Sequence, residues 1–289
     1  MIEDHVVKLS NMKSSPYYKQ FDDMIDSWEN NIAQITETLE LLIAVQGKWS
    51  YLESIFRGQQ DISKQLARES AIFQKINNDF KIEMERLNKD RNAFKSLIVK
   101  GFIPTLQEMN KTLESIQKNL NQFLESKRGL FPRFYFLSND DLLEIIGQAK
   151  DPEPICKHIK KIFEGINSLK YTQQGSRQNK QFEITTLVSP EKEEVEIKQV
   201  IVDARVEQWL KALMDAMKEA LKKIFFKFYQ ENMGGGKKLP EREKLMKIIR
   251  ATQGQVLITC AQMQWTNEVK YALEQLEANG QVNALKKAR

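Results

Sequence analysis

Residues 18–42 read YKQFDDMIDSWENNIAQITETLELL, a segment in which apolar residues recur alternately three and four positions apart. The members of the series are Tyr18, Phe21, Ile25, Trp28, Ile32, Ile35, Leu39 and Leu42. Trp49 continues it after a single break at Gln46. This period predicts one long helix with a coiled-coil-like seam, extended through Phe56 and closed near Gly58. At about 1.5 Å of rise per residue such a helix spans roughly 50 Å, so we expect an elongated molecule.

The same period returns further along the chain. It predicts a second helix over residues 61–90, antiparallel to the first, and a third that follows Pro104 and ends near Gly129. Two more helical regions are expected, one over residues 205–231 and a last one that contains Leu245, Ile248 and Ile249 and then residues 256–276. Only 12 glycines and 7 prolines occur among the 289 residues, a composition that favours long helices over a turn-rich β fold.

The period changes to two over residues 182–201. The alternating residues are Phe182, Ile184, Thr186 and Val188, then Val195, Ile197, Gln199 and Ile201. The sequence Ser189-Pro190-Glu191-Lys192 between them is typical of a turn, so we predict one β-hairpin with a half-buried face. A lone hairpin is marginally stable in water, so this face is expected to pack on helices or on a partner. The predicted fold class is mainly α, an elongated stack of helical bundles with one small β-hairpin.

Irregular segments separate the helices. Residues 131–136 (FPRFYF) combine Pro132 with four aromatic rings, which indicates a packed connector rather than a helix. Ser138 is expected to cap a short helix, and another is expected to start at residues 151–154. Four parts are therefore predicted. They are a long-helix part (1–100), a second helical bundle with the connector (101–170), a hairpin region (171–204) and a C-terminal helical subdomain (205–289).

Charge is unevenly distributed along the chain. The net charge is +5, and residues 205–289 hold 16 Lys/Arg against 9 Asp/Glu, whereas the preceding residues hold 28 against 30. No arginine-rich cluster with interleaved aromatic residues indicates nucleic acid. No apolar run approaches the roughly 18 residues of a membrane span, and no signal segment is expected at the start. Cys156 and Cys260 are too few for a disulfide scaffold, so we expect free thiols in an intracellular protein.

Three patterns could suggest chemistry, and each has a simpler structural explanation. Residues 234–238 (GGGKK) lack the Ser/Thr and the preceding strand of a phosphate-binding loop, so a flexible linker is expected. Cys156 and His158 lie two positions apart on a helix, so their side chains diverge. Asp140 and Asp141 lie in a first helical turn, where the macrodipole favours negative charge. No catalytic, cofactor-binding or metal-binding residue is predicted, since a zinc site needs about four clustered ligands.

Aromatic residues along the helices are expected to be core. Trp28, Trp49 and Trp209 lie on apolar stripes, and replacing a buried Trp28 by alanine should cost about 3–5 kcal/mol. From the residues alone, the chain is an elongated helical protein with one hairpin, which suggests a scaffold, a spacer or a lever.

A series of motifs in a fixed order is more specific than any single helix. Residues 45–56 read VQGKWSYLESIF, and residues 131–146 read FPRFYFLSNDDLLEII. The motif residues are Trp28, Trp49, Tyr51, Phe56, Phe131, Pro132, Arg133, Phe134, Leu142, Trp209 and Trp265. In this order the chain resembles the linker region of dynein heavy chains over residues 15–276. The sequences of residues 136–139 (FLSN) and 150–152 (KDP) resemble those of axonemal dyneins more than those of cytoplasmic dyneins.

The resemblance implies a mechanical role. In that family the linker lies across a ring of six AAA+ modules, and it bends and straightens as the first module binds, hydrolyses and releases ATP. The resemblance implies that this segment is not an enzyme and holds no cofactor, since ATP and Mg belong to the ring of the parent motor. The implied partners are the AAA+ ring of the same heavy chain and, only through the parent motor, microtubules. No nucleic acid and no membrane are expected, and the expected location is cytoplasmic and cytoskeletal, in the ciliary axoneme.

Two places are expected to matter for the lever. Gly101 and Pro104 mark the candidate hinge, because an irregular Gly/Pro segment there separates two bundles. The candidate hairpin surface for docking on the ring consists of Phe182, Ile184, Val195 and Ile197.

The alternative is a stand-alone helical scaffold or spacer with no motor role. Spectrin-like repeats would show an internal period, and none is visible, while the hairpin interrupts the helical series. A membrane-curving helical dimer would need a dense basic face on its long helices, but residues 1–204 are net acidic. An independent enzyme is the third class, and the lack of catalytic motifs disfavours it.

Overall fold

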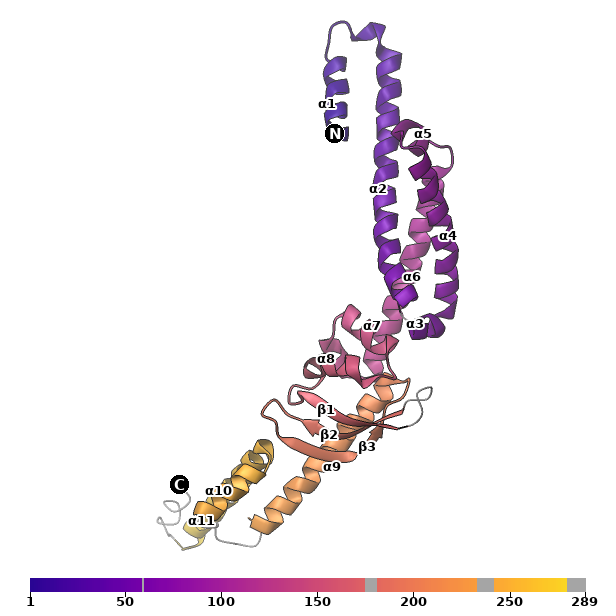
Figure 1. The fold of residues 1–289 in the computed structure, drawn as a ribbon. Helices are drawn as coiled ribbons and strands as arrows, with labels where there is room; N and C mark the ends of the chain where they lie inside the picture. The colour runs from indigo at the N-terminus through magenta and orange to yellow at the C-terminus, as the bar shows by residue number, and fades with distance from the viewer. Residues whose placement is uncertain (59, 175–180, 233–241, 280–289) are drawn as a thin grey trace. The chain divides into compact units, whose positions relative to one another are not determined.

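The structure is a computed structural model that describes residues 1–58, 60–174, 181–232 and 242–279 (Figure 1). Eleven α-helices, two short 3-10 helices and three strands lie in these residues, which confirms the mainly α prediction. The chain divides into two compact units. The first comprises residues 1–130 and 138–148, and the second comprises residues 131–137 and 149–289. The four-part division drawn from the sequence stays a prediction.

The first unit begins with a helical hairpin. α1 (Ile2–Lys13) is followed by one 3-10 turn, η1 (Tyr18–Gln20), and by α2 (Asp22–Gly58). The 37 residues of α2 confirm the long helix predicted from the seam, and at about 1.5 Å per residue it is about 55 Å long. The sequence patterns do not predict α1, because its few apolar residues form too short a series. It lies antiparallel beside the first half of α2 (Figure 1).

Shorter helices follow α2. α3 (Gln60–Gln65) and α4 (Ala67–Lys89) occupy the segment predicted as one helix, which breaks at Leu66 because the dihedrals of that residue (φ −115°, ψ 51°) are not helical. The third, α5 (Ala93–Leu97), is capped by Asn92, whose side chain accepts hydrogen bonds from two backbone amides.

The core of the first unit is built on α6 (Phe102–Leu130), which packs along α2. The predicted apolar period of this helix is confirmed. Its buried residues include Leu106, Met109, Leu113, Ile116, Leu120 and Leu124. α7 (Asn139–Gly147) contacts α3 and α6. The predicted cap is present, since the Ser138 hydroxyl accepts a hydrogen bond from the Asp141 amide at 3.1 Å.

The second unit contains an antiparallel sheet in the order β1-β2-β3. Its strands are β1 (Ser168–Gln174), β2 (Gln181–Val188) and β3 (Glu194–Ile201). β2 and β3 confirm the predicted hairpin. β1 is an addition that the sequence does not predict, because only Leu169 of its residues is buried and no apolar alternation results.

The other elements of this unit are helices. They are η2 (Pro132–Phe136), α8 (Pro152–Ile162), α9 (Val206–Asn232), α10 (Arg242–Ala251) and α11 (Gly254–Asn279). α8 contacts β1, and α9 contacts β3. The second half of α9 packs with α10 and α11 around a small apolar cluster that contains Phe228, Val256 and Cys260.

The predicted half-buried face of the hairpin is wrong in the second half of β3. The pairing of β2 with β3 shifts between Ile184 and Thr186, so that Ile184 lies opposite Val200. Val200 is buried, whereas Gln199 is exposed and Ile201 is 50% exposed, although both were predicted on the inner face. An irregularity in the pairing moves successive side chains to the other face of the sheet, and alternation in the sequence does not show where it falls.

Candidate functional site

The tip of the β2–β3 hairpin is held by a dense set of local hydrogen bonds. The Ser189 hydroxyl accepts from the backbone N–H of Glu191 (3.2 Å) and of Glu193 (3.1 Å). The Ser189 N–H donates to the carbonyl of Glu193 at 2.9 Å. Lys192 lies in the left-handed region at φ +67°, which lets the chain reverse within a few residues. The turn predicted from the sequence is therefore confirmed, and these hydrogen bonds stabilise its backbone conformation.

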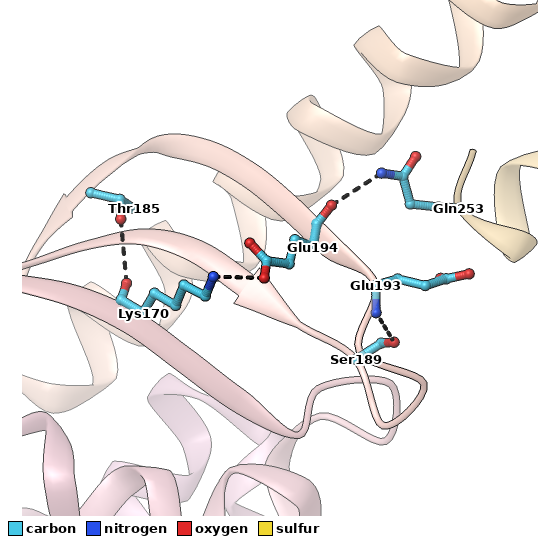
Figure 2. Close-up of polar contacts among 6 residues, drawn as sticks. All are labelled: Lys170, Thr185, Ser189, Glu193, Glu194 and Gln253. Atoms are coloured by element: carbon cyan, nitrogen blue, oxygen red, sulfur yellow. Dashed lines mark hydrogen bonds and ion pairs between the residues drawn. The ribbon is translucent and has the colours of Figure 1, made fainter. Parts of the chain in front are cut away.

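This turn is joined to the start of α11. Nε2 of Gln253 donates to the carbonyl oxygen of Glu194 at 3.1 Å, a contact that Figure 2 shows beside the turn. The backbone N–H of Gly254 donates to Oε1 of Glu193 at 2.9 Å. Gly254 is the first residue of α11, and the first amides of a helix have no partner within it. Glu193 therefore caps a helix that begins 61 positions later, where the helix dipole also favours a carboxylate.

A second set of contacts joins the same turn to β1. Nζ of Lys170 pairs with Oε1 of Glu194 at 2.6 Å, and the Thr185 hydroxyl lies 3.5 Å from the carbonyl oxygen of Lys170 (Figure 2). The two charged side chains are 54% and 51% exposed, so their pairing contributes only about 0–1 kcal/mol. Glu194 thus contacts β1 through its side chain and Gln253 through its carbonyl, and it connects the sheet with the start of α11.

The residues predicted for docking differ in their availability. Ile184 is fully buried in the core of the chain itself, so its predicted place on a docking surface is wrong. Phe182, Val195 and Ile197 are half-buried and keep some exposed surface. The ring of Phe182 also contacts the ring of Tyr171, with centroids 5.6 Å apart. Three of the four predicted residues therefore offer surface to a partner.

The FPRFYF connector forms η2 around two buried rings. Phe131 and Phe134 are buried, and their ring centroids lie 5.0 Å apart in an edge-to-face arrangement. Nη1 of Arg133 donates to the carbonyl of Ile162 at 2.9 Å, and its guanidinium lies 4.8 Å from the ring centroid of Phe163. Ile162 is the last residue of α8, so Arg133 satisfies a carbonyl that the helix leaves free. The predicted packing is confirmed for Phe131 and Phe134 only, since Tyr135 is 59% and Phe136 is 71% exposed. The prediction that the segment is not helical is wrong, because Pro132 opens a five-residue 3-10 helix.

The VQGKWSYLESIF block lies in the second half of α2. Nε1 of Trp49 donates to Oδ1 of the buried Asn77 at 3.1 Å, which ties α2 to α4. The rings of Phe56 and Phe73 are stacked at 5.4 Å. Tyr51 is half-buried, and this burial raises the pKa of its hydroxyl. These residues form packing contacts between helices, as does Leu142 of α7, which is fully buried.

The four tryptophans do not share one environment. Trp209 is buried, as predicted, and Trp49 is half-buried. The prediction that Trp28 is core is wrong, because this ring is 45% exposed and contacts Phe94 of α5 edge-on at 4.8 Å. Trp265 on α11 is 60% exposed.

Comparison with known proteins identifies the family of this chain. The family model described as "Dynein heavy chain, N-terminal region 2" matches residues 1–227, more than three-quarters of the chain. The chain belongs to the dynein heavy chains.

Similar dynein heavy chains come from distant organisms. The dynein-1-beta heavy chain of the flagellar inner arm I1 complex of Chlamydomonas reinhardtii is 41% identical over 273 residues, and dynein axonemal heavy chain 2 of Mus musculus is 42% identical over 273 residues. Both alignments cover 94% of this chain. A cytoplasmic dynein heavy chain of Neurospora crassa is 33% identical over 281 residues, covering 93% of this chain. The chain spans 6% of the length of each of these relatives.

In this dynein segment the predicted hinge residues lie at the start of α6. Gly101 immediately precedes the helix and has φ +89°, a conformation that favours glycine. Pro104 lies in the first turn, where the missing N–H removes no helical hydrogen bond. The helix therefore starts two residues before Pro104 rather than after it. Bending at this place stays a prediction.

Among the described residues, no three or more His, Cys, Asp and Glu side chains gather in a way that could hold a metal ion. None of the described helices combines the length and apolar content that a membrane crossing requires. Cys156 and Cys260 are free thiols, and burial raises the pKa of both. Asp140 and Asp141 lie in the first turn of α7, as predicted. Residues 234–238 lie outside the described part.

The sequence patterns do not reveal the contact of Glu193 with the start of α11. They predict the turn, but nothing local connects Glu193 with Gly254. One signal was available. The residue before α11 is Gln253, which is not among the usual N-cap residues, so a cap from elsewhere in the dynein segment was to be expected.

Proposed function

We propose that this chain is the linker of an axonemal dynein heavy chain, a lever that couples ATP-driven changes in the AAA+ ring to movement along microtubules. The observation that carries the proposal is the alignment of 94% of the chain with dynein heavy chains at 41–42% identity. The axonemal assignment rests on the names of these two relatives and on the length of their alignments, 273 residues, compared with 225 residues at 40% identity for cytoplasmic dynein 2 heavy chain 1 of Mus musculus. A place in the axoneme of cilia or flagella follows from it.

The first unit has the construction that a lever needs. A lever must resist bending, and α2 is supported along its second half by contacts to both α4 and α6. Trp49 reaches Asn77 on α4, while Nζ of Lys48 donates to Oδ1 of Asn110 at 2.8 Å and pairs with Glu114, both on α6. Side chains with no exposed surface fill the space between these helices, which makes the bundle stiff.

The proposed partners follow from the lever role. The segment would dock on the AAA+ ring of the same heavy chain and meet microtubules only through the parent motor. ATP and Mg would belong to that ring, and the segment would not be an enzyme by itself. A purified chain of residues 1–289 should therefore show no ATP turnover above background, and steady turnover would contradict this part of the proposal.

The hairpin is the proposed docking element. Val195 and Ile197 keep exposed surface on β3, and the turn beside them holds the start of α11 through Glu193. A load on the hairpin would therefore reach α11 directly. In the intact heavy chain, replacing Val195 and Ile197 by serine should slow microtubule gliding, while Gln199→Ser, on the same strand, should not. Unchanged gliding in the first variant would contradict docking through this face.

The lever role is tested by changing the point at which the heavy chain is attached to the surface. A heavy chain that carries this segment is attached to a surface either through a tag before α1 or through a tag after α11, which bypasses the lever. Gliding velocity should fall severalfold in the second arrangement, while the microtubule-stimulated ATPase rate stays equal. Equal velocities would overturn the lever and leave the scaffold alternative.

A further inference from the structure

The corner between α10 and α11 meets the β2–β3 turn through two hydrogen bonds. Nε2 of Gln253 donates to the carbonyl oxygen of Glu194 at 3.1 Å, and the backbone N–H of Gly254 donates to Oε1 of Glu193 at 2.9 Å. Figure 2 shows the side chain of Glu193 extending from the turn toward the segment that carries Gln253. We call these two hydrogen bonds the hairpin clasp.

The hairpin clasp is polar and accessible to water. Glu194 is exposed, while Glu193, Gln253 and Gly254 are half-buried. A cavity of about 460 Å³ lies beside it, between β3 and α9. Its lining includes Gln253 and the charged residues Glu194, Glu196, Lys198, Glu219 and Lys223. Water can replace both partners of such hydrogen bonds, so the clasp can open at a modest cost in free energy.

The first turn of α11 connects the hairpin clasp with a small apolar cluster. Val256 lies two residues after Gly254 and is 4% exposed. It packs with Phe228 of α9 and with Cys260, which follows one turn later on the same face of α11. These are the three buried side chains of the cluster, so loss of Val256 from it would expose the other two.

Glu193 stabilises this first turn from outside the helix. The helix begins where the N–H of Leu257 donates to the carbonyl oxygen of Gln253 at 3.1 Å, which makes Gly254 its first residue. The N–H of Gly254 has no partner within the helix, and the carboxylate of Glu193 accepts it. The negative charge of that carboxylate is also favourable at the start of a helix.

We infer that the hairpin clasp is a conformational device that controls how α11 is held on α9. When the clasp is closed, the first turn of α11 is capped and Val256 stays in the cluster. When it opens, this turn frays and the start of α11 leaves α9. The β2–β3 turn persists, because the bonds of Ser189 to the backbone of Glu191 and Glu193 involve no residue of α11. The inference stands independently of the lever.

The thiol of Cys260 reports the opening in the intact chain of residues 1–289. Cys260 has no exposed surface, so a maleimide labels it only in molecules whose cluster has opened. Glu193→Ala removes the cap, and labelling of Cys260 should be at least about threefold faster than in the wild type. Glu191→Ala is the matched control, since it removes an exposed carboxylate from the same turn and leaves the clasp intact. Equal rates in the two variants would overturn the inference.

The second cysteine distinguishes local opening from general destabilisation. Cys156 is half-buried on α8, a helix that contacts β1. Its labelling, followed separately by peptide mass spectrometry, should be equal in the wild type and in both variants. If Glu193→Ala accelerated labelling of Cys156 as much as that of Cys260, the whole unit would be destabilised, and the clasp would not be a local device.

A double-mutant cycle tests whether Glu193 acts through the N–H of Gly254. Gly254→Pro removes this N–H at the first helical position, where proline is well tolerated. In the Gly254→Pro chain, Glu193→Ala should leave the labelling rate of Cys260 unchanged. The same acceleration with and without the N–H would mean that Glu193 acts in another way, and the inference would be wrong.

Discussion

The two halves of α2 have the same kind of sequence and different surroundings. Both carry apolar residues alternately three and four positions apart within one unbroken helix. In the second half, Val45 and Leu52 have no exposed surface, and Phe56 is buried against α4. In the first half, Ile25 and Ile35 are buried, but Trp28 is 45% exposed. The difference arises because α4 and α6 flank the second half, while α1 and the short α5 lie beside the first (Figure 1).

This difference shows what a heptad-like pattern determines. The pattern fixes which face of a helix is apolar, since that depends only on spacing and on 3.6 residues per turn. It does not fix how deeply that face is buried, because burial depends on the segments that return to it. The burial of Trp28 is wrongly predicted for this reason, whereas the helix on which it lies is correctly predicted.

The largest expected effect is in the enclosed half. Leu52→Ala removes a side chain with no exposed surface, so the free energy of unfolding should fall by about 2–5 kcal/mol. Leu39→Ala is the matched control in the open half, where the side chain is only half-buried, so the loss should be smaller. Urea denaturation followed by circular dichroism measures both. Equal losses would mean that the two halves are enclosed to the same degree.

A polar contact sharpens the contrast further. Trp49→Phe removes the donor to Asn77, whose side chain is buried, so the free energy of unfolding should fall by about 1–3 kcal/mol. Trp209→Phe is a matched control, because Nε1 of the buried Trp209 has no hydrogen-bond partner in the described structure and the change removes none. Trp209→Phe should therefore cost clearly less in the same denaturation experiment. A reversed order would show that the bond to Asn77 contributes nothing.

Much of the fold follows from the sequence because the period of a helix is a local property. α2, α6 and α9 are predicted from their spacing, and the cap of α7 from Ser138 alone. The parts that are not predicted depend on residues far apart. β1 is a strand only because β2 lies beside it, and Ile201 is exposed because the pairing shifts at Ile184.

The candidate site shows the same limit. The turn at Ser189 is local chemistry and is predicted. Its contact with Gly254 spans 61 positions and is not. Among the motif residues, Phe131, Phe134 and Trp209 are core while Trp265 is exposed, a distinction that spacing in the sequence cannot make.

A smaller effect is expected in the open half. Trp28→Ala loses an edge-on contact with Phe94 and the burial of part of the ring, so the free energy of unfolding should fall by about 1–2 kcal/mol. This is well below the 3–5 kcal/mol expected for a core tryptophan. Trp49→Ala, in the enclosed half, should cost more in the same urea series. A loss for Trp28→Ala as large as for Trp49→Ala would mean that the first half of α2 is enclosed as well.

The smallest effect concerns the way in which α1 is held against the open half. Lys13 is the charged link, with its Nζ 2.7 Å from both Asp26 and Glu29 on α2. Hydrogen bonds to Asp26 and then Glu29 raise the pKa of Lys13 above its ordinary value. The link is therefore fully present at neutral pH and is lost only as pH rises through this elevated pKa. Salt is the effective probe, because exposed pairs are screened.

Hydrogen exchange at neutral pH tests this last contrast. In Lys13→Gln, the amides of α1 should exchange faster than in the wild type, and added salt should accelerate exchange in the wild type more than in the variant. The amides of α6 should not respond, because that helix is held on the enclosed half by buried apolar side chains such as Leu113 and Leu120. If α1 exchanged equally in both proteins at all salt concentrations, apolar contact alone would hold it. The first half of α2 would then be more completely covered than the 60% exposure of Met24 indicates.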